Sequence, residues 1–133
     1  METLSYQQRI SRVLRHIEQH LDERPDLDGL ARIACFSPYH FHRIFSAMVG
    51  ESVAAYVRRL LLERAAMQLG HSDEPVTQIA LGAGYESMDA FARAFRAHFG
   101  MLPSAYRRRR GNLEAARRRD MTRPLFYHEM PDC

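Results

Sequence analysis

Residues 79–100, IALGAGYESMDAFARAFRAHFG, largely repeat an earlier stretch of the chain, residues 30–50, LARIACFSPYHFHRIFSAMVG. From Ser37 onward, matching residues lie 50 positions apart: Ser37 and Ser87, Phe41 and Phe91, Arg43 and Arg93, Phe45 and Phe95, Gly50 and Gly100, Tyr56 and Tyr106. Before Ser37 they lie 49 positions apart: Leu30 and Ile79, Ala31 and Ala80, Phe36 and Tyr85. One residue was therefore gained or lost in a turn, where length changes are best tolerated. A short helix, a tight turn and a longer helix, present twice, predict two helix-turn-helix units.

The sequence around the repeat also indicates helices. Near the N-terminus, a possible capping box, Ser5 with Gln8, precedes a stripe of apolar residues at helical spacing: Ile10, Val13, Leu14, Ile17 and Leu21. Ser52 and Gly70 mark the two ends of a long helix between the units. We expect an all-α fold of about seven helices, in which two helix-turn-helix subdomains are joined by this long linker helix. The later segments begin at or near residues 27, 38, 52, 75, 87 and 103 and end near residues 34, 49, 69, 83, 99 and 106.

Each unit has the residues that a helix-turn-helix requires. Ala31 and Ala80 are small enough for the place where the two helices cross. Four positions later the turn needs a positive φ, which Gly84 adopts freely and Cys35 adopts at a modest backbone cost. Apolar residues are expected to anchor the second helix of each unit in the core, rather than to stack on bases: Phe41, Ile44, Phe45 and Met48, then Phe91, Phe95 and Phe99.

The opposite faces of these second helices can meet DNA. With Ser37 and Ser87 as caps, the exposed residues are expected to be Tyr39, His42, Arg43 and Ser46 in the first unit, and Met88, Asp89, Ala92, Arg93 and Arg96 in the second. Arg43 and Arg93 occupy equivalent places and are our candidates for contacts to guanine O6 and N7. The alternative is that each is a solvated helix arginine, but its recurrence in a repeated unit favours the DNA contact.

The repeat resembles the AraC/XylS family of transcription regulators. The similarity is carried by Gly84-Tyr85-Glu86-Ser87, Phe91-Ala92-Arg93-Ala94-Phe95, Phe99-Gly100 and Pro103-Ser104-Ala105-Tyr106-Arg107, together with Leu30-Ala31 and residues 37–45 upstream, and it covers about residues 6–110. The resemblance implies a regulator, usually an activator, in which Tyr39, His42 and Arg43 read one major groove. It implies that Met88, Asp89 and Arg93 lie in a second groove.

Three departures from the family pattern concern these same surfaces. Cys35 replaces the usual turn glycine, and Ser46 stands where a basic residue is common. Asp89 and Ala92 leave the second face poor in hydrogen-bond donors, and a carboxylate repels phosphate. The second unit is therefore expected to contribute less affinity.

The excess positive charge lies in the C-terminal tail. All 19 basic residues are arginine: residues 1–106 carry 11 of them with 12 acidic residues, and residues 107–133 carry 8 with 4. Arginine binds phosphate and guanine through a planar fork, but an all-arginine composition is equally expected of a GC-rich genome. The cluster that begins at Arg107 is interpreted either as a solvated linker or as a phosphate contact.

We divide the chain into a DNA-binding domain, residues 1–110, and a basic linker, residues 111–133, that leads toward a missing effector-binding domain. Residues 125–131, LFYHEMP, resemble the first strand of a GyrI-like effector-binding domain. The expected partners are double-stranded DNA, RNA polymerase and, only through the missing domain, a small-molecule effector. The tandem units predict a monomer.

Other classes of function are disfavoured. No run of about 18 apolar residues could span a membrane, and no secretion signal begins the chain, which predicts a cytoplasmic protein. His40 and His42 are two apart on a helix and cannot readily share a metal, and no phosphate loop or nucleophile motif occurs, so we expect no enzyme, metal or cofactor. A nonspecific nucleoid-type DNA-binding protein is the main alternative. A protein-interaction module is disfavoured by the repeated arginine-bearing helices.

Overall fold

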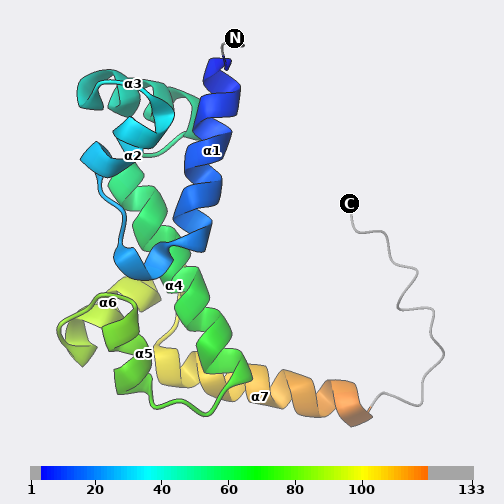
Figure 1. Ribbon diagram of the computed structural model, residues 1–133. Helices are drawn as coiled ribbons and strands as arrows, with labels where there is room; N and C mark the ends of the chain where they lie inside the picture. Colours follow the sequence, from blue (N-terminus) through cyan, green and yellow to red (C-terminus); the bar gives the residue numbers. More distant parts are fainter. Residues whose placement is uncertain (1–3, 120–133) are drawn as a thin grey trace.

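The computed structural model describes residues 4–119, and the side chains through residue 113. Every regular element in that range is a helix, as the sequence predicts. In chain order they are α1 (Tyr6–Gln19), the 3₁₀ helix η1 (Leu21–Glu23), α2 (Leu27–Ala34), α3 (Pro38–Val49), α4 (Val53–His71), α5 (Val76–Gly82), α6 (Met88–Phe99) and α7 (Pro103–Arg119). In Figure 1 helix α4 runs through the centre of the molecule. Helices α1, α2 and α3 surround its upper part, and α5, α6 and α7 surround its lower part.

The helix starts follow the serine signals. The hydroxyl groups of Ser37, Ser52 and Ser87 accept hydrogen bonds from backbone N–H groups three residues later, at the starts of α3, α4 and α6. Ser5 and Gln8 form the predicted capping box. Because such bonds satisfy donors that have no partner within the helix, each cap contributes about 1 kcal/mol.

Two hydrophobic cores lie along α4. The first is formed by α1, α2, α3 and the N-terminal half of α4 up to Leu61. The second begins at Leu62 and includes α5, α6 and the start of α7. Helix α4 is thus both the linker and a structural part of each unit. On its surface Arg59 pairs with Glu51 at 2.7 Å and with Glu63 at 3.2 Å, and the hydrogen bond that Arg59 donates to Glu51 raises the pKa of Arg59.

The repeat is visible in individual contacts. Before the serine, the N–H of Phe36 donates to the carbonyl of Ala31, and 49 residues later the N–H of Tyr85 donates to the carbonyl of Ala80. After the turn, the N–H of Phe41 donates to the carbonyl of Ser37, and 50 residues later the N–H of Phe91 donates to the carbonyl of Ser87. Two edge-to-face ring pairs correspond as well, Phe45 with Tyr56 at 5.7 Å and Phe95 with Tyr106 at 5.4 Å. The alignment is therefore structurally correct, and the extra residue of the second unit, Glu86, lies in the turn.

Four details differ from the expectation. Helix α4 does not end at Gly70 but continues to His71. The absence of a side chain at Gly70 leaves room for α7, since a Cβ there would lie 3.3 Å from Arg110 Cγ. Helix α7 continues past Tyr106 to Arg119, as arginine favours helix. Leu21, predicted as the last residue of the α1 stripe, lies in η1. Met48 is not a core anchor, because its side chain is 42% exposed.

Candidate nucleic-acid interface

Helix α3 presents one polar face to solvent. Tyr39, His42 and Arg43 are exposed, and Ser46 is half-buried on the same face; positions 39, 42, 43 and 46 follow helical spacing. Phe41 and Phe45 are fully buried on the other side and fix the rotation of the helix. The Arg43 guanidinium carbon lies 5.9 Å from the centre of the Tyr39 ring, which is 72% exposed. The two side chains thus form one surface that carries a ring face, a hydroxyl and a planar cation.

Helix α6 presents the corresponding face of the second unit. Met88, Asp89, Arg93 and Arg96 are exposed, whereas Ala92 is half-buried. Buried Phe91 and Phe95 anchor this helix as their counterparts anchor α3. Within the part of the chain that the structure describes, no hydrogen bond or ion pair joins Arg43, Arg93 or Arg96 to another protein group. Their guanidinium groups are therefore available to an external acceptor.

The second helices of the two units lie at different places along α4. In the view of Figure 1, α3 lies by the upper end of α4 and α6 to the left of its lower half, while α7 leaves to the right. The turns that place the two helices have the predicted backbone: Cys35 has φ 61° and Gly84 has φ 95°. The first turn is further held by Arg9 of α1, whose Nε donates to Ala34 O at 2.7 Å and whose Nη2 donates to Cys35 O.

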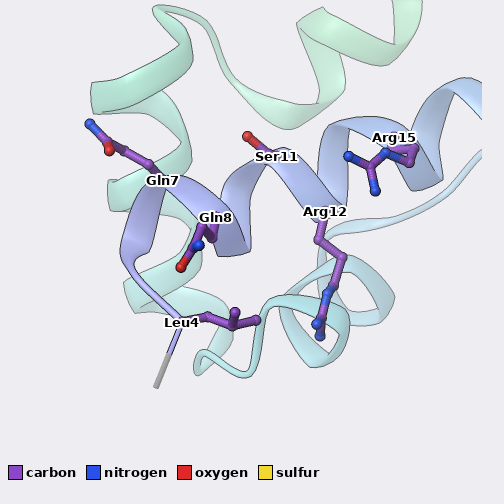
Figure 2. A pocket seen from close by; sticks show the side chains of 6 residues that line it. All are labelled: Leu4, Gln7, Gln8, Ser11, Arg12 and Arg15. Atoms are coloured by element: carbon purple, nitrogen blue, oxygen red, sulfur yellow. The ribbon is translucent and has the colours of Figure 1, made fainter. Parts of the chain in front are cut away.

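The outer side of α1 carries a different basic surface. A hollow of about 330 Å³ is lined by Leu4, Gln7, Gln8, Ser11, Arg12 and Arg15. Figure 2 shows that the side chains of Gln7, Arg12 and Arg15 diverge from one another rather than converge on one point. It is therefore not a preformed site for a small ligand. Among the described residues no group of three or more His, Cys, Asp or Glu side chains could hold a metal, and no helix is long and apolar enough to cross a membrane.

Comparisons with known proteins agree with this arrangement. The sequence model of a helix-turn-helix domain family matches residues 30–109. Regulatory protein SoxS of Salmonella typhimurium is 32% identical over 106 residues, which are 80% of this chain and 99% of SoxS. The chain belongs to the AraC/XylS family. The members of this family are DNA-binding transcription regulators rather than enzymes.

Longer relatives match over part of their length. The uncharacterized regulator YbfP of Bacillus subtilis is 39% identical over 102 residues, which are 77% of this chain and 35% of YbfP. The transcriptional regulator Rob of Salmonella typhimurium is 36% identical over 92 residues, 69% of this chain and 32% of Rob. The chain therefore spans about a third of the length of these two relatives.

Solved structures of AraC-type domains share the fold. An AraC-type transcriptional regulator from Chromobacterium violaceum superposes with a TM-score of 0.74 at 26% identity, over 78% of this chain and 93% of that one. The DNA-binding domain of AdpA, a global transcriptional factor solved with a target DNA, gives a TM-score of 0.67 at 28% identity, over 86% of this chain and 97% of that one.

Arg107 has an internal role in this AraC/XylS-family chain that the sequence did not indicate. Its Nε donates to Leu69 O at 3.0 Å, and its Nη2 donates to Ser72 O at 3.2 Å and Glu74 O at 2.7 Å. Three of its five N–H groups thus hold the loop between α4 and α5. The prediction that Arg107 binds DNA is not tested by these contacts, but only two N–H groups remain for it. Arg108 and Arg109 are exposed.

Two further residues of the α3 surface were missed. A hollow of about 440 Å³ beside α3 is lined by the predicted Tyr39 and Arg43 and also by His40, Ile44 and Ala47. His40 was considered only as a metal ligand, and Ala47 carries no polar signal. On a helical wheel both residues lie next to Arg43, on one side of the predicted face. The LFYHEMP segment, residues 125–131, lies outside the described residues.

Proposed function

We propose that this chain is a sequence-specific transcription regulator, an activator, that reads two successive major grooves with α3 and α6. The observation that carries the proposal is the duplicated recognition face: Arg43 and Arg93 occupy equivalent, exposed positions, and neither makes a hydrogen bond or ion pair to another described residue. An exposed arginine fork on a helix of a helix-turn-helix suits the two acceptors of guanine in the major groove. The solved complex of the AdpA domain with a target DNA supports DNA binding by this fold.

The linker fixes the scale of the proposed site. Helix α4 has 19 residues, and at 1.5 Å per residue it is about 28 Å long. Recognition helices attached near its two ends can enter grooves about 34 Å apart, one turn of DNA. One chain would then cover an asymmetric site of about 20 base pairs that contains two boxes, without a dimer.

The two boxes are not expected to contribute equally. The α3 face combines Tyr39, His42 and Arg43, all of which can donate hydrogen bonds, with the adjacent hollow. The α6 face has Arg93 and Arg96 but also Asp89, which accepts from cytosine N4 and repels phosphate. We therefore assign the stronger box to α3.

The remaining parts of the proposal concern partners. Activation requires contact with RNA polymerase, and residues 111–133 would connect the DNA-binding domain, residues 1–110, to a domain that senses a small-molecule effector. This is in keeping with the greater length of YbfP and Rob. The chain acts as a monomer in the cytoplasm in this proposal.

Selection from random DNA with the full chain tests the function. The wild-type protein should yield an asymmetric consensus with two boxes about one turn apart. Arg43→Ala should relax one box and Arg93→Ala the other, each at about 1–3 kcal/mol of base discrimination. Arg12→Ala, which removes an exposed arginine from α1, is the charge-matched control and should leave both boxes unchanged. Recovery of no consensus would favour the nonspecific nucleoid-type alternative.

A further inference from the structure

In both units arginine side chains donate hydrogen bonds to carbonyls at the turn, but the arginines come from different parts of the chain. In the first unit the carbonyls of Ala34 and Cys35 both accept from Arg9. Arg9 lies on α1, which belongs to the same unit. Since carbonyls at a helix C-terminus lack partners within the helix and carry partial negative charge, a guanidinium there stabilises the turn. The first turn is thus braced from within its own unit.

The second turn is braced by the first unit. Arg24, which follows η1, donates from Nη2 to Leu81 O at 3.2 Å. Arg64 of α4 donates to Gly82 O at 3.1 Å and pairs with Asp22 of η1 at 2.7 Å. Leu81 and Gly82 are the last two residues of α5. Residues 22–24 of the first unit therefore hold, directly and through Arg64, the end of the helix that precedes the second recognition helix.

The repeat shows that this arrangement differs between the units. The residue 49 positions after Arg9 is Arg58, on α4, and no hydrogen bond from Arg58 to this turn is present among the described residues. The second unit takes its brace from Arg24 instead. Figure 1 shows η1 crossing α4 near the middle of its length, between the two groups of helices.

Arg24 also fits closely against the second turn. A Cβ at Gly84 would lie 3.0 Å from Arg24 Nε and 3.3 Å from its Cζ, so the guanidinium lies directly over the glycine. Arg24 itself has φ 47° and ψ 68°, a left-handed conformation that residues other than glycine rarely adopt. Such a conformation persists where surrounding contacts fix it. The segment is therefore shaped to place this side chain.

We propose that Arg24, together with the Asp22–Arg64 pair, is a positioning residue that sets the relative orientation of α3 and α6 and hence the spacing of the two DNA boxes. The inference rests on the proposed function. The two cores share α4 and change over between Leu61 and Leu62. A bend of about 15° there, acting over the roughly 15 Å of α4 that follows, would move the far end of α4 by about 4 Å, more than the rise of about 3.4 Å per base pair. A second link between the units, from Glu51 through Arg59 and Glu63 to His98 of α6, ends in a distance of 4.0 Å between Glu63 Oε2 and His98 Nε2.

Spacing preference is the first test. Arg24→Gly removes the side chain while it retains the backbone conformation, so the fold is kept. Binding is measured to the selected site and to sites with one base pair added or removed between the boxes. The wild-type protein should lose about tenfold in affinity on each change, since base contacts in one box are lost. Arg24→Gly should bind the selected site several-fold more weakly and lose less than about threefold on a spacing change.

Three outcomes decide the first test. Arg24→Lys, which restores one cationic donor, should recover part of the spacing preference, and Arg12→Ala should behave as wild type although it removes the same charge. A spacing penalty of wild-type size in Arg24→Gly would overturn the proposal even if the variant bound all three sites more weakly, because an equal loss at all three spacings is the result of a merely structural role.

Distance measurement in the free protein is the second test and does not depend on DNA. Spin labels at Ala47→Cys and Ala97→Cys, exposed and equivalent positions on α3 and α6, are placed in a Cys35→Gly, Cys133→Ser background. The distribution of label distances should be narrow with Arg24 present and broader or shifted in Arg24→Gly. An unchanged distribution would overturn the inference. A wild-type protein that lacks box preference would instead contradict the proposed function, while the distances still decide the role of Arg24.

Discussion

Cys35 and Gly84 occupy equivalent turn positions but have different intrinsic backbone preferences. Cys35 has φ 61° and an exposed side chain, so the left-handed conformation is a cost without a packing benefit. Gly84 has φ 95° and lies against Arg24. The same turn is therefore strained in the first unit and relaxed in the second. Substitutions at the two positions should for this reason change the free energy of unfolding in opposite directions.

Exchanging the residue types at these turns should change stability in opposite directions. Cys35→Gly is expected to raise the free energy of unfolding by about 0.5–1 kcal/mol, after allowance for the greater entropy of glycine in the unfolded chain. Gly84→Ala should lower it by about 1–2 kcal/mol, because of the positive φ and the contact with Arg24. Urea denaturation measures both. Changes of the same sign would show that the turns are not equivalent.

Tyr85 has a buried polar atom that its counterpart lacks. Its hydroxyl group has no hydrogen-bond partner among the described residues, and burial raises the pKa of the hydroxyl. The equivalent residue in the first unit is Phe36. Tyr85→Phe is expected to increase the free energy of unfolding by about 1 kcal/mol, because an unsatisfied buried donor is removed. Thermal unfolding measures the change. The control Tyr39→Phe alters an exposed hydroxyl and should leave the melting temperature unchanged. A lower melting temperature for Tyr85→Phe would instead indicate that the hydroxyl makes a stabilising hydrogen bond.

At the scale of elements, local signals were visible in the sequence and tertiary ones were not. A serine cap acts on an N–H three residues away, so the starts of α3, α4 and α6 could be predicted from Ser37, Ser52 and Ser87. The role of Gly70 depends on where α7 crosses α4, which no local pattern encodes. From the sequence alone, a glycine at this position predicts the end of the helix, and the structure shows that this prediction is wrong for Gly70.

The same distinction applies to the candidate site. The exposure of Tyr39, His42 and Arg43 follows from the cap position and helical spacing, and the structure places them as predicted. Which arginines hold backbone carbonyls could not be foreseen, because the carbonyls of Leu69 and Leu81 come close to Arg107 and Arg24 only in the folded chain. Charge counting treats these arginines and the exposed ones alike.

Arg107 should stabilise the attachment of α7 to the loop after α4. Arg107→Ala removes three hydrogen bonds to carbonyls and is expected to lower the free energy of unfolding by about 1–3 kcal/mol, given the partial exposure of the side chain. Arg109→Ala, at an exposed position of the same helix, is the matched control and should leave stability nearly unchanged. An equal melting temperature for both variants would contradict this role.

Salt dependence separates this role from DNA binding. Each phosphate contact contributes close to one unit to the slope of log affinity against log salt. A fall of about one unit in Arg107→Ala would support the prediction that its two remaining N–H groups bind phosphate. An unchanged slope assigns Arg107 to stability alone. The same measurement on Arg109→Ala distinguishes a phosphate contact from a solvated linker.

At the scale of the whole molecule, one helix contributes to two similar units. Each unit alone is small, and α4 supplies buried residues to both cores: Val53, Tyr56, Val57 and Leu61 to the first, and Leu62, Ala65, Ala66 and Leu69 to the second. Neither unit can lose α4 without losing part of its core. The two recognition faces are therefore expected to fold and act together, in one fixed order along the chain.

The fixed order leads to a prediction about the direction of the DNA boxes. In a two-fold symmetric dimer the half-sites are inverted copies, and the dimer binds a palindrome. Two tandem units in one chain have no such symmetry, so each box should be recognised in one orientation only. Inverting the α6 box, with its centre kept in place, should lower affinity by at least about tenfold, since one lost base contact costs about 1–3 kcal/mol. Competition binding measures the loss, and sedimentation of the complex should show one chain per site. Stronger binding to the inverted site, with two chains on it, would contradict both the monomer and the two-groove reading.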